Sequence, residues 1–238
     1  MKEGQPVPRG LCPGRIPGSN PGVGIGQEAT PGIFLFKMTI AIITGASSGL
    51  GHHFTKQLQN FFNVDEIWVI ARRKDRLDEL AKEIPNVKPL PLDLTNKQHL
   101  QTFKQKLETE KPEIKVLINN AGYGKRGDFA EVNIEHHLGQ IELNINSLVT
   151  ITHLCIPFME KNSYILQVAS VAAHIPLPKA STYAATKAFV LSFSTSLAAE
   201  LRKKHIHVIA VCPGPVKTEF FDVFSDGKEI GQGPMADP

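Results

Sequence analysis

From residue 39 onward, short runs of β-branched and aliphatic residues alternate with longer stretches in which apolar positions follow a helical period. The short runs are Ile40–Thr44, Ile67–Ala71, Val87–Leu94, Lys115–Ala121, Tyr164–Ser170 and His207–Gly214. Helices are expected from about Gly49, over Asp75–Ile84, from Lys97, over Ile134–Met159 and around Tyr183. Apolar strands that alternate with helices are typical of a parallel sheet covered on both faces. The pattern therefore predicts an α/β fold, a doubly wound parallel sheet of six strands joined by right-handed crossovers.

The pattern begins abruptly at Met38. Residues 1–37 contain 6 Pro and 8 Gly and show neither a strand nor a helix period. Such a composition is typical of disordered segments. We predict a disordered Gly/Pro-rich leader over residues 1–37, to which we assign no function, and one domain over residues 38–238.

Composition and charge exclude several classes of protein. The net charge is only +3, and the basic residues are scattered, so no basic stripe indicates nucleic acid or an anionic membrane. No apolar run reaches the roughly 20 residues that span a bilayer. The three cysteines, Cys12, Cys155 and Cys212, are an odd number, which argues against a disulfide framework. We therefore expect a cytoplasmic protein that binds neither nucleic acid nor a membrane.

The first predicted strand runs straight into a glycine-rich turn, TGASSGLG (Thr44–Gly51), which opens a helix. Glycines allow a tight turn and a close approach of the backbone to a ligand, and a helix N-terminus attracts phosphate. The alternative is a glycine-rich turn without a ligand. The residues expected to cradle a phosphate are Gly45, Ser47, Ser48, Gly49, Leu50 and Gly51.

Arg72 and Arg73 follow the second predicted strand, at the position where an NAD-binding unit usually places an acidic residue for the ribose 2′-hydroxyl. Guanidinium groups suit a 2′-phosphate, so the sequence favours NADP(H) over NAD(H). The alternative is a solvated basic start to the next helix. Asp93 and Leu94 follow the third strand, where the adenine end would lie. For Asp93 the alternative is a helix N-cap, for which Thr95 competes.

Taken together, these motifs resemble the short-chain dehydrogenase/reductase family over about Thr39–Phe221, which implies a Rossmann-type fold. The resemblance rests on the glycine motif, on Asn-Asn-Ala-Gly at Asn119–Gly122, and on a Tyr-x-x-x-Lys pair with a serine thirteen residues before the tyrosine. It implies the catalytic residues Asn144, Ser170, Tyr183 and Lys187. It also implies further cofactor contacts from Asn120, Ala121, Gly122, Tyr183 and Lys187, and from Pro213, Gly214, Val216 and Thr218 in PGPVKT, the segment that closes over the nicotinamide.

The resemblance also implies one role for each catalytic residue. Tyr183 would protonate the carbonyl oxygen, and Lys187 would lower the pKa of that phenol and hold the nicotinamide ribose. Ser170 would polarise the oxygen, and Asn144 would anchor a water that resupplies protons. Two alternatives stay open, because Asn146 competes with Asn144 and Ser170 could be merely a small buried residue.

The expected substrate is a moderately hydrophobic carbonyl or alcohol. His174, Ile175, Pro176 and Leu177 should lie near the substrate mouth, and Phe220 and Phe221 should lie in the lid that closes over it. The pairs His52–His53 and His136–His137 have no carboxylate or thiol at ligand spacing, so no metal is predicted.

The sequence thus predicts an NADP(H)-dependent oxidoreductase acting on a secondary alcohol or ketone. The alternative is a non-catalytic cofactor-binding protein, such as an interaction or redox-sensing module, or an inactive fragment. The fragment is considered because the chain stops at GQGPMADP, where the family normally adds a seventh strand. A complete C-terminus would be expected to support a homo-oligomer, a dimer or tetramer.

Overall fold

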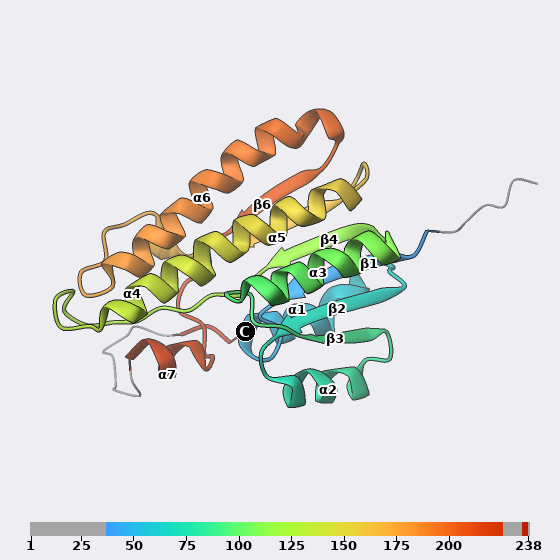
Figure 1. Cartoon of the computed structure of the whole chain (residues 1–238). Coiled ribbons are helices and arrows are strands. Elements are labelled where there is room, and N and C mark those ends of the chain that lie inside the picture. Colours follow the sequence, from blue (N-terminus) through green and yellow to red (C-terminus); the bar gives the residue numbers. More distant parts are fainter. Residues whose placement is uncertain (1–36, 226–234, 238) are drawn as a thin grey trace, which may run out of the picture. The chain divides into compact units, whose positions relative to one another are not determined.

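The computed structural model describes residues 37–225 and 235–237 (Figure 1). The predicted leader lies outside the described residues except for Lys37. The described part belongs to one compact unit, Phe36–Pro238. None of the helices described in it is long and apolar enough to cross a membrane.

Six strands form one parallel sheet in the order β3-β2-β1-β4-β5-β6. The strands are β1 (Thr39–Thr44), β2 (Glu66–Ala71), β3 (Val87–Pro91), β4 (Glu113–Asn119), β5 (Tyr164–Val168) and β6 (His207–Val211). This topology confirms the predicted doubly wound α/β fold. Four of the predicted runs extended two or three residues too far, because the chain leaves the sheet as soon as it reaches the carboxyl edge.

Helices occupy all the predicted intervals, and one further helix, Phe220–Ser225, was not predicted. They are α1 (Gly49–Gln57), α2 (Lys74–Glu83), α3 (Lys97–Glu110), α4 (Ile134–Ile141), α5 (Leu148–Cys155), α6 (Ser181–Leu201) and α7 (Phe220–Ser225). Short 3₁₀ turns are η1 (Leu58–Asn60), η3 (Ile156–Phe158), η4 (Val171–Ala173) and η5 (Arg202–Lys204), whereas η2 (Glu142–Ser147) is a π-helical turn. The predicted stretch Ile134–Met159 is therefore one helical path, α4 to η3, with a π turn in its middle.

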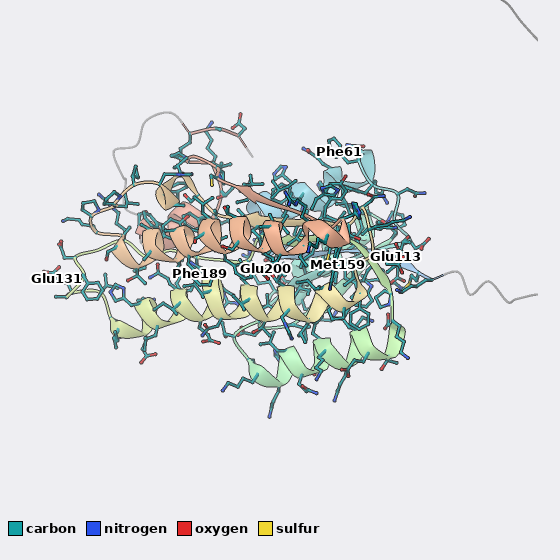
Figure 2. The ribbon with its side chains drawn as sticks, turned by 90° about the horizontal axis from the view of Figure 1, so that it is seen from above. Phe61, Glu113, Glu131, Met159, Phe189 and Glu200 are labelled. Atoms are coloured by element: carbon teal, nitrogen blue, oxygen red, sulfur yellow. The ribbon has the colours of Figure 1, made fainter. Side chains whose placement is uncertain are left out.

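Alternation along the strands builds two cores, one on each face of the sheet. Ile40 and Ile42 pack with side chains of α3, α5 and α6, whereas Ala41 and Ile43 pack with those of η1 and α2. Figure 2 looks onto α3, α5 and α6, which lie side by side across their face of the sheet. Successive residues of a strand point to opposite faces, so a central strand of this kind must be apolar throughout.

Candidate functional site

A cleft of about 970 Å³ lies along the carboxyl ends of the strands. Because all six strands are parallel, the loops that follow them meet at this one edge of the sheet. The predicted site residues on its wall are Gly45, Ser47, Ser48, Gly49, Leu50, Arg72, Arg73, Asp93, Leu94, Asn120, Ala121, Gly122, Ser170, Tyr183, Lys187, Pro213, Gly214, Val216 and Thr218. Gly51 and Asn144 lie behind the wall rather than on it.

The glycine-rich turn forms a cradle, and residues with side chains larger than that of glycine would fill it. Gly45 and Gly49 have φ angles of +68° and +53°, in the left-handed region that favours glycine. A Cβ at Gly51 would lie 2.3 Å from the carbonyl oxygen of Gly45, so this glycine allows α1 to pack against the turn. The N-cap Ser48 makes no side-chain capping bond within the described residues. The first amides of α1 are therefore left for an anion.

Thr44 and Asn120 join the glycine-rich turn to the loop after β4. The Thr44 hydroxyl accepts hydrogen bonds from the backbone amides of Asn120 and Ala121, both at 3.0 Å. In return, Asn120 Nδ2 donates to the carbonyl oxygens of Thr44 and Gly45, at 3.0 and 3.1 Å. These bonds fix the two predicted motifs against each other.

The two arginines after β2 differ in their contacts. Arg73 Nη2 donates to the hydroxyls of Ser47 and Ser48, at 3.0 and 2.8 Å. Its Nη1 donates to the Glu219 carboxylate at 2.8 Å. Arg72 lines the cleft and forms no ion pair with the described residues. The idea that the pair is merely a solvated helix start is therefore not supported for Arg73, whose side chain turns back to the glycine-rich turn.

Asp93 lies on the cleft wall and does not cap a helix. Its Oδ1 accepts from the Thr95 amide at 2.9 Å and from the Thr95 hydroxyl at 2.7 Å. Partial burial raises the pKa of this carboxyl, but the bonds from Thr95 and the charges of Arg72 and His99 together outweigh burial and leave the pKa below its usual value. The N-cap of α3 is Asn96, whose side chain accepts from the amides of Gln98 and His99. The N-cap alternative for Asp93 and Thr95 is wrong.

Asn144 lies in the π turn η2, buried beneath the loop after β4. Its Oδ1 accepts from the Tyr123 amide at 3.0 Å, and its Nδ2 donates to the Tyr123 carbonyl oxygen at 2.9 Å and to the Thr186 hydroxyl at 3.0 Å. The competing Asn146 is exposed and donates to Glu142. A π turn often marks a functional position in a helix, because it re-aims a side chain. Here it directs Asn144 toward the loop and α6.

Tyr183 and Lys187 lie one turn apart on α6, both buried. Lys187 Nζ lies 5.9 Å from the Tyr183 ring centroid and donates to the Val168 carbonyl oxygen at 2.7 Å. Burial lowers the pKa of Lys187 to about 8. Burial raises the pKa of Tyr183, and a hydrogen bond with Ser170 partly opposes that rise. Burial is the largest cause of the Tyr183 shift, and the Lys187 charge is not among its causes, so the lowering of the phenol's pKa by Lys187 stays a prediction.

Aromatic rings line the cleft beside Tyr183. Phe220 and Phe224 have ring centroids 5.5 and 5.6 Å from that of Tyr183, and Phe221 packs with them. Gly124 allows this arrangement, since a Cβ there would lie 2.7 Å from Phe224 and 2.8 Å from Tyr183. Figure 1 shows α7, which carries these rings, beyond the carboxyl ends of the strands. The predicted apolar mouth is therefore present.

Some residues of the cleft carry no recognisable signal in the sequence. Of the segment expected at the mouth, Ile175 and Leu177 line the cleft, whereas His174 and Pro176 do not. Lining residues that the sequence did not indicate include Tyr123, Arg126, His136, Leu143, Glu219 and Phe224. The described residues contain no group of three or more His, Cys, Asp or Glu side chains that could hold a metal ion.

Comparison with known proteins agrees with this geometry. A sequence model of the family described as short chain dehydrogenase matches residues 39–229. Sulfoacetaldehyde reductase 2 of Chromohalobacter salexigens is 32% identical over 200 residues, covering 80% of this chain and 77% of that protein. A short-chain dehydrogenase from Sphingobium yanoikuyae in complex with NADPH has a TM-score of 0.75 at 30% identity, covering 84% of this chain and 80% of that one. A 3-ketoacyl-(acyl-carrier-protein) reductase from Brucella melitensis complexed with NADH has a TM-score of 0.71 at 27% identity, covering 78% and 79%.

Proposed function

Because the chain belongs to the short-chain dehydrogenase/reductase family of oxidoreductases, we propose that it transfers a hydride between NADP(H) and a secondary alcohol or ketone. The observation that carries the proposal is the wall of the cleft formed by Ser170, Tyr183 and Lys187. A phenol, a hydroxyl and an ammonium group there face the same space as the glycine-rich turn. This is the set of groups that carbonyl reduction needs beside a dinucleotide.

The shape of the cleft fits a nicotinamide dinucleotide. The left-handed glycines and the open amides of α1 suit the pyrophosphate. Asp93 and Leu94 would flank the adenine end, and Pro213, Gly214, Val216 and Thr218 line the cleft as well. Arg72 and Arg73 support NADP(H) in preference to NAD(H), because a guanidinium attracts and hydrogen-bonds a 2′-phosphate.

Each proposed catalytic residue has a task that its surroundings favour. The bound nicotinamide would supply or accept the hydride. Tyr183 would give its proton to the carbonyl oxygen, and its raised pKa keeps the phenol protonated at neutral pH. Ser170 would hydrogen-bond the same oxygen as negative charge develops. Lys187, with a pKa of about 8, is largely protonated at neutral pH and would favour the phenolate after the proton has left.

Asn144 would act from behind the wall. Two of its three hydrogen bonds hold the backbone of Tyr123, and the third reaches Thr186 on α6. It would thereby keep the loop after β4 and the Tyr183 helix in register, and its remaining lone pair could hold a water that resupplies protons.

The aromatic cluster of Phe220, Phe221 and Phe224 supports a moderately hydrophobic substrate.

We further propose self-association, since Ile134, Leu138 and Ile141 are 57%, 52% and 39% exposed at helical spacing on α4. A cytoplasmic location is also proposed, on the ground that Cys155 and Cys212 carry free thiols.

Turnover of NADPH with a panel of ketones tests the proposal. Tyr183→Phe should lower kcat by roughly 10²- to 10⁴-fold, because it removes the proton donor. Ser170→Ala should lower kcat by about 10²-fold with NADPH affinity retained. Tyr164→Phe is the matched control, since Tyr164 is a β5 residue outside the cleft wall.

Two results would contradict the proposal. Undiminished turnover in Tyr183→Phe would exclude the phenol as the proton donor. A kcat/KM ratio for NADPH over NADH below one would exclude the cofactor preference.

A further inference from the structure

A carboxylate holds Arg73, one of the two arginines that the proposed function assigns to the 2′-phosphate. Glu219 precedes α7, and its Oε2 accepts from Arg73 Nη1 at 2.8 Å. Its Oε1 lies 3.4 Å from Arg76 Nη1, on the first turn of α2. Arg73 and Glu219 are 146 residues apart in the chain, so this pair joins the segment before α7 to the end of β2.

The contacts leave Arg73 few free donors. Its Nε and Nη2 both bond to Ser47, Nη2 also bonds to Ser48, and Nη1 bonds to Glu219. A guanidinium has five N–H groups, so one at most is left for another acceptor. A 2′-phosphate could not bind Arg73 through two parallel bonds while Glu219 keeps its position.

The neighbouring residues place Glu219 directly over the cradle. Thr218, the preceding residue, has its side chain 3.1 Å from the point where a Cβ of Gly49 would lie. Ser48, on the same turn, also hydrogen-bonds the Glu219 carboxylate. Glu219 therefore lies against the glycine-rich turn as well as against the arginines.

We propose that Glu219 is a specificity-determining residue for the cofactor, whose carboxylate occupies the place of the 2′-phosphate on Arg73 until NADP(H) displaces it. The inference rests on the proposed function, because it takes Arg73 as a 2′-phosphate ligand. A phosphate dianion and a carboxylate compete for the same guanidinium and repel each other, so Glu219 weakens NADP(H) binding selectively. NAD(H) has a hydroxyl at the same position and does not need the pair to break.

The test is the dissociation constant of NADPH and of NADH, measured by titrating nicotinamide fluorescence for the wild type and Glu219→Gln. Both partners are partly exposed, with side-chain exposures of 43% and 44%, so the effect is moderate. Glu219→Gln should tighten NADPH binding by roughly two- to five-fold and leave NADH binding unchanged. The gain should shrink at 0.5 M salt, because exposed charges are screened.

Asp222→Asn is the matched control. It removes one negative charge from an exposed position on α7, three residues from Glu219. It should change neither dissociation constant. Arg73→Gln should weaken NADPH binding by about tenfold or more and should abolish the response to Glu219→Gln in the double variant.

The outcomes separate the two proposals. If Arg73→Gln leaves NADPH binding unchanged, Arg73 is not a phosphate ligand and this inference fails, whereas the cofactor assignment then rests on Arg72. If Arg73→Gln weakens NADPH binding but Glu219→Gln has no effect, or affects both cofactors equally, only the role of Glu219 is overturned. Weaker NADPH binding in Glu219→Gln would also overturn it, since Glu219 would then orient Arg73 for the phosphate.

Discussion

Lys187 is a residue of the site that destabilises the folded protein. Its side chain is buried, and its ammonium group donates to the Val168 carbonyl oxygen without a carboxylate partner among the described residues. Water would solvate this charge better than one carbonyl group does, and the lowered pKa expresses that cost. A charge kept under these conditions is better explained by the chemistry of the cleft than by the stability of α6.

The stability cost of Lys187 should depend on pH. The folded-state pKa of about 8 lies below the ordinary value of 10.5, so between these values the unfolded chain binds a proton that the folded chain does not. Stability from this group therefore rises with pH across that window, and the full cost applies below about pH 8. Lys187→Met should therefore raise the free energy of unfolding above that of the wild type. This gain should be larger at pH 7 than at pH 10.5, by on the order of 3 kcal/mol.

Urea unfolding of both proteins at several pH values measures this difference. Lost bonding to Val168 adds an offset that does not vary with pH, so the slope is the informative quantity. Lys203→Met, at an exposed lysine in η5, is the control and should show no such slope. A flat difference for Lys187→Met would contradict the buried charge.

At the scale of elements, the sequence predicted the helices and strands whose positions the local pattern of apolar residues determines. The strands were readable because both faces of the sheet are covered, which makes them apolar throughout. The end of β3 could not be predicted, because Leu92 and Leu94 continue its apolar pattern, yet the Leu92 amide bonds back to the Leu90 carbonyl oxygen and turns the chain into the cleft. The π turn around Asn144 was not predicted, and the bonds of Asn144 to Tyr123 and Thr186 join segments that no local pattern connects.

The junction of β1 and α1 yields a prediction about one glycine. Gly51→Ala should destabilise the protein by roughly 2 kcal/mol or more, because the new Cβ would lie 2.3 Å from the Gly45 backbone oxygen. Alanine's better helix propensity, worth about 1 kcal/mol, would not compensate. The measurement is the free energy of unfolding.

Gly214→Ala provides the matched control within the same cleft. A Cβ at Gly214 would meet nothing within 4 Å in the described residues, so its effect should stay within about 0.5 kcal/mol. Equal effects of the two substitutions would show that the close packing of α1 is not what requires Gly51.

At the scale of the molecule, a parallel sheet explains why so much of the site was predictable. Every strand delivers its following loop to one edge, so motifs after β1, β2, β4 and β5 had to converge there. The pairing of Arg73 with Glu219 and the packing of Gly124 against Tyr183 join distant segments, and the sequence does not indicate them. The substrate-facing end is built largely from such contacts, which is why the sequence specifies the chemistry more closely than the substrate.

The domain boundary at Met38 can be tested on the whole chain. A chain that begins at Met38 should unfold within about 2 °C of the full chain and bind NADPH equally well. The described strands and the lining of the cleft all lie after this residue, and the Met38 carbonyl oxygen already accepts from the Glu113 amide at 2.8 Å. The truncation removes the exposed pair of Lys37 with Glu160, which contributes at most about 1 kcal/mol.

A chain that begins at Ile42 is the control and should not fold, because β1 is hydrogen-bonded on both sides by β2 and β4. If the chain from Met38 melts more than about 5 °C lower or binds NADPH more weakly, residues 1–37 contribute to the domain and the boundary is wrong.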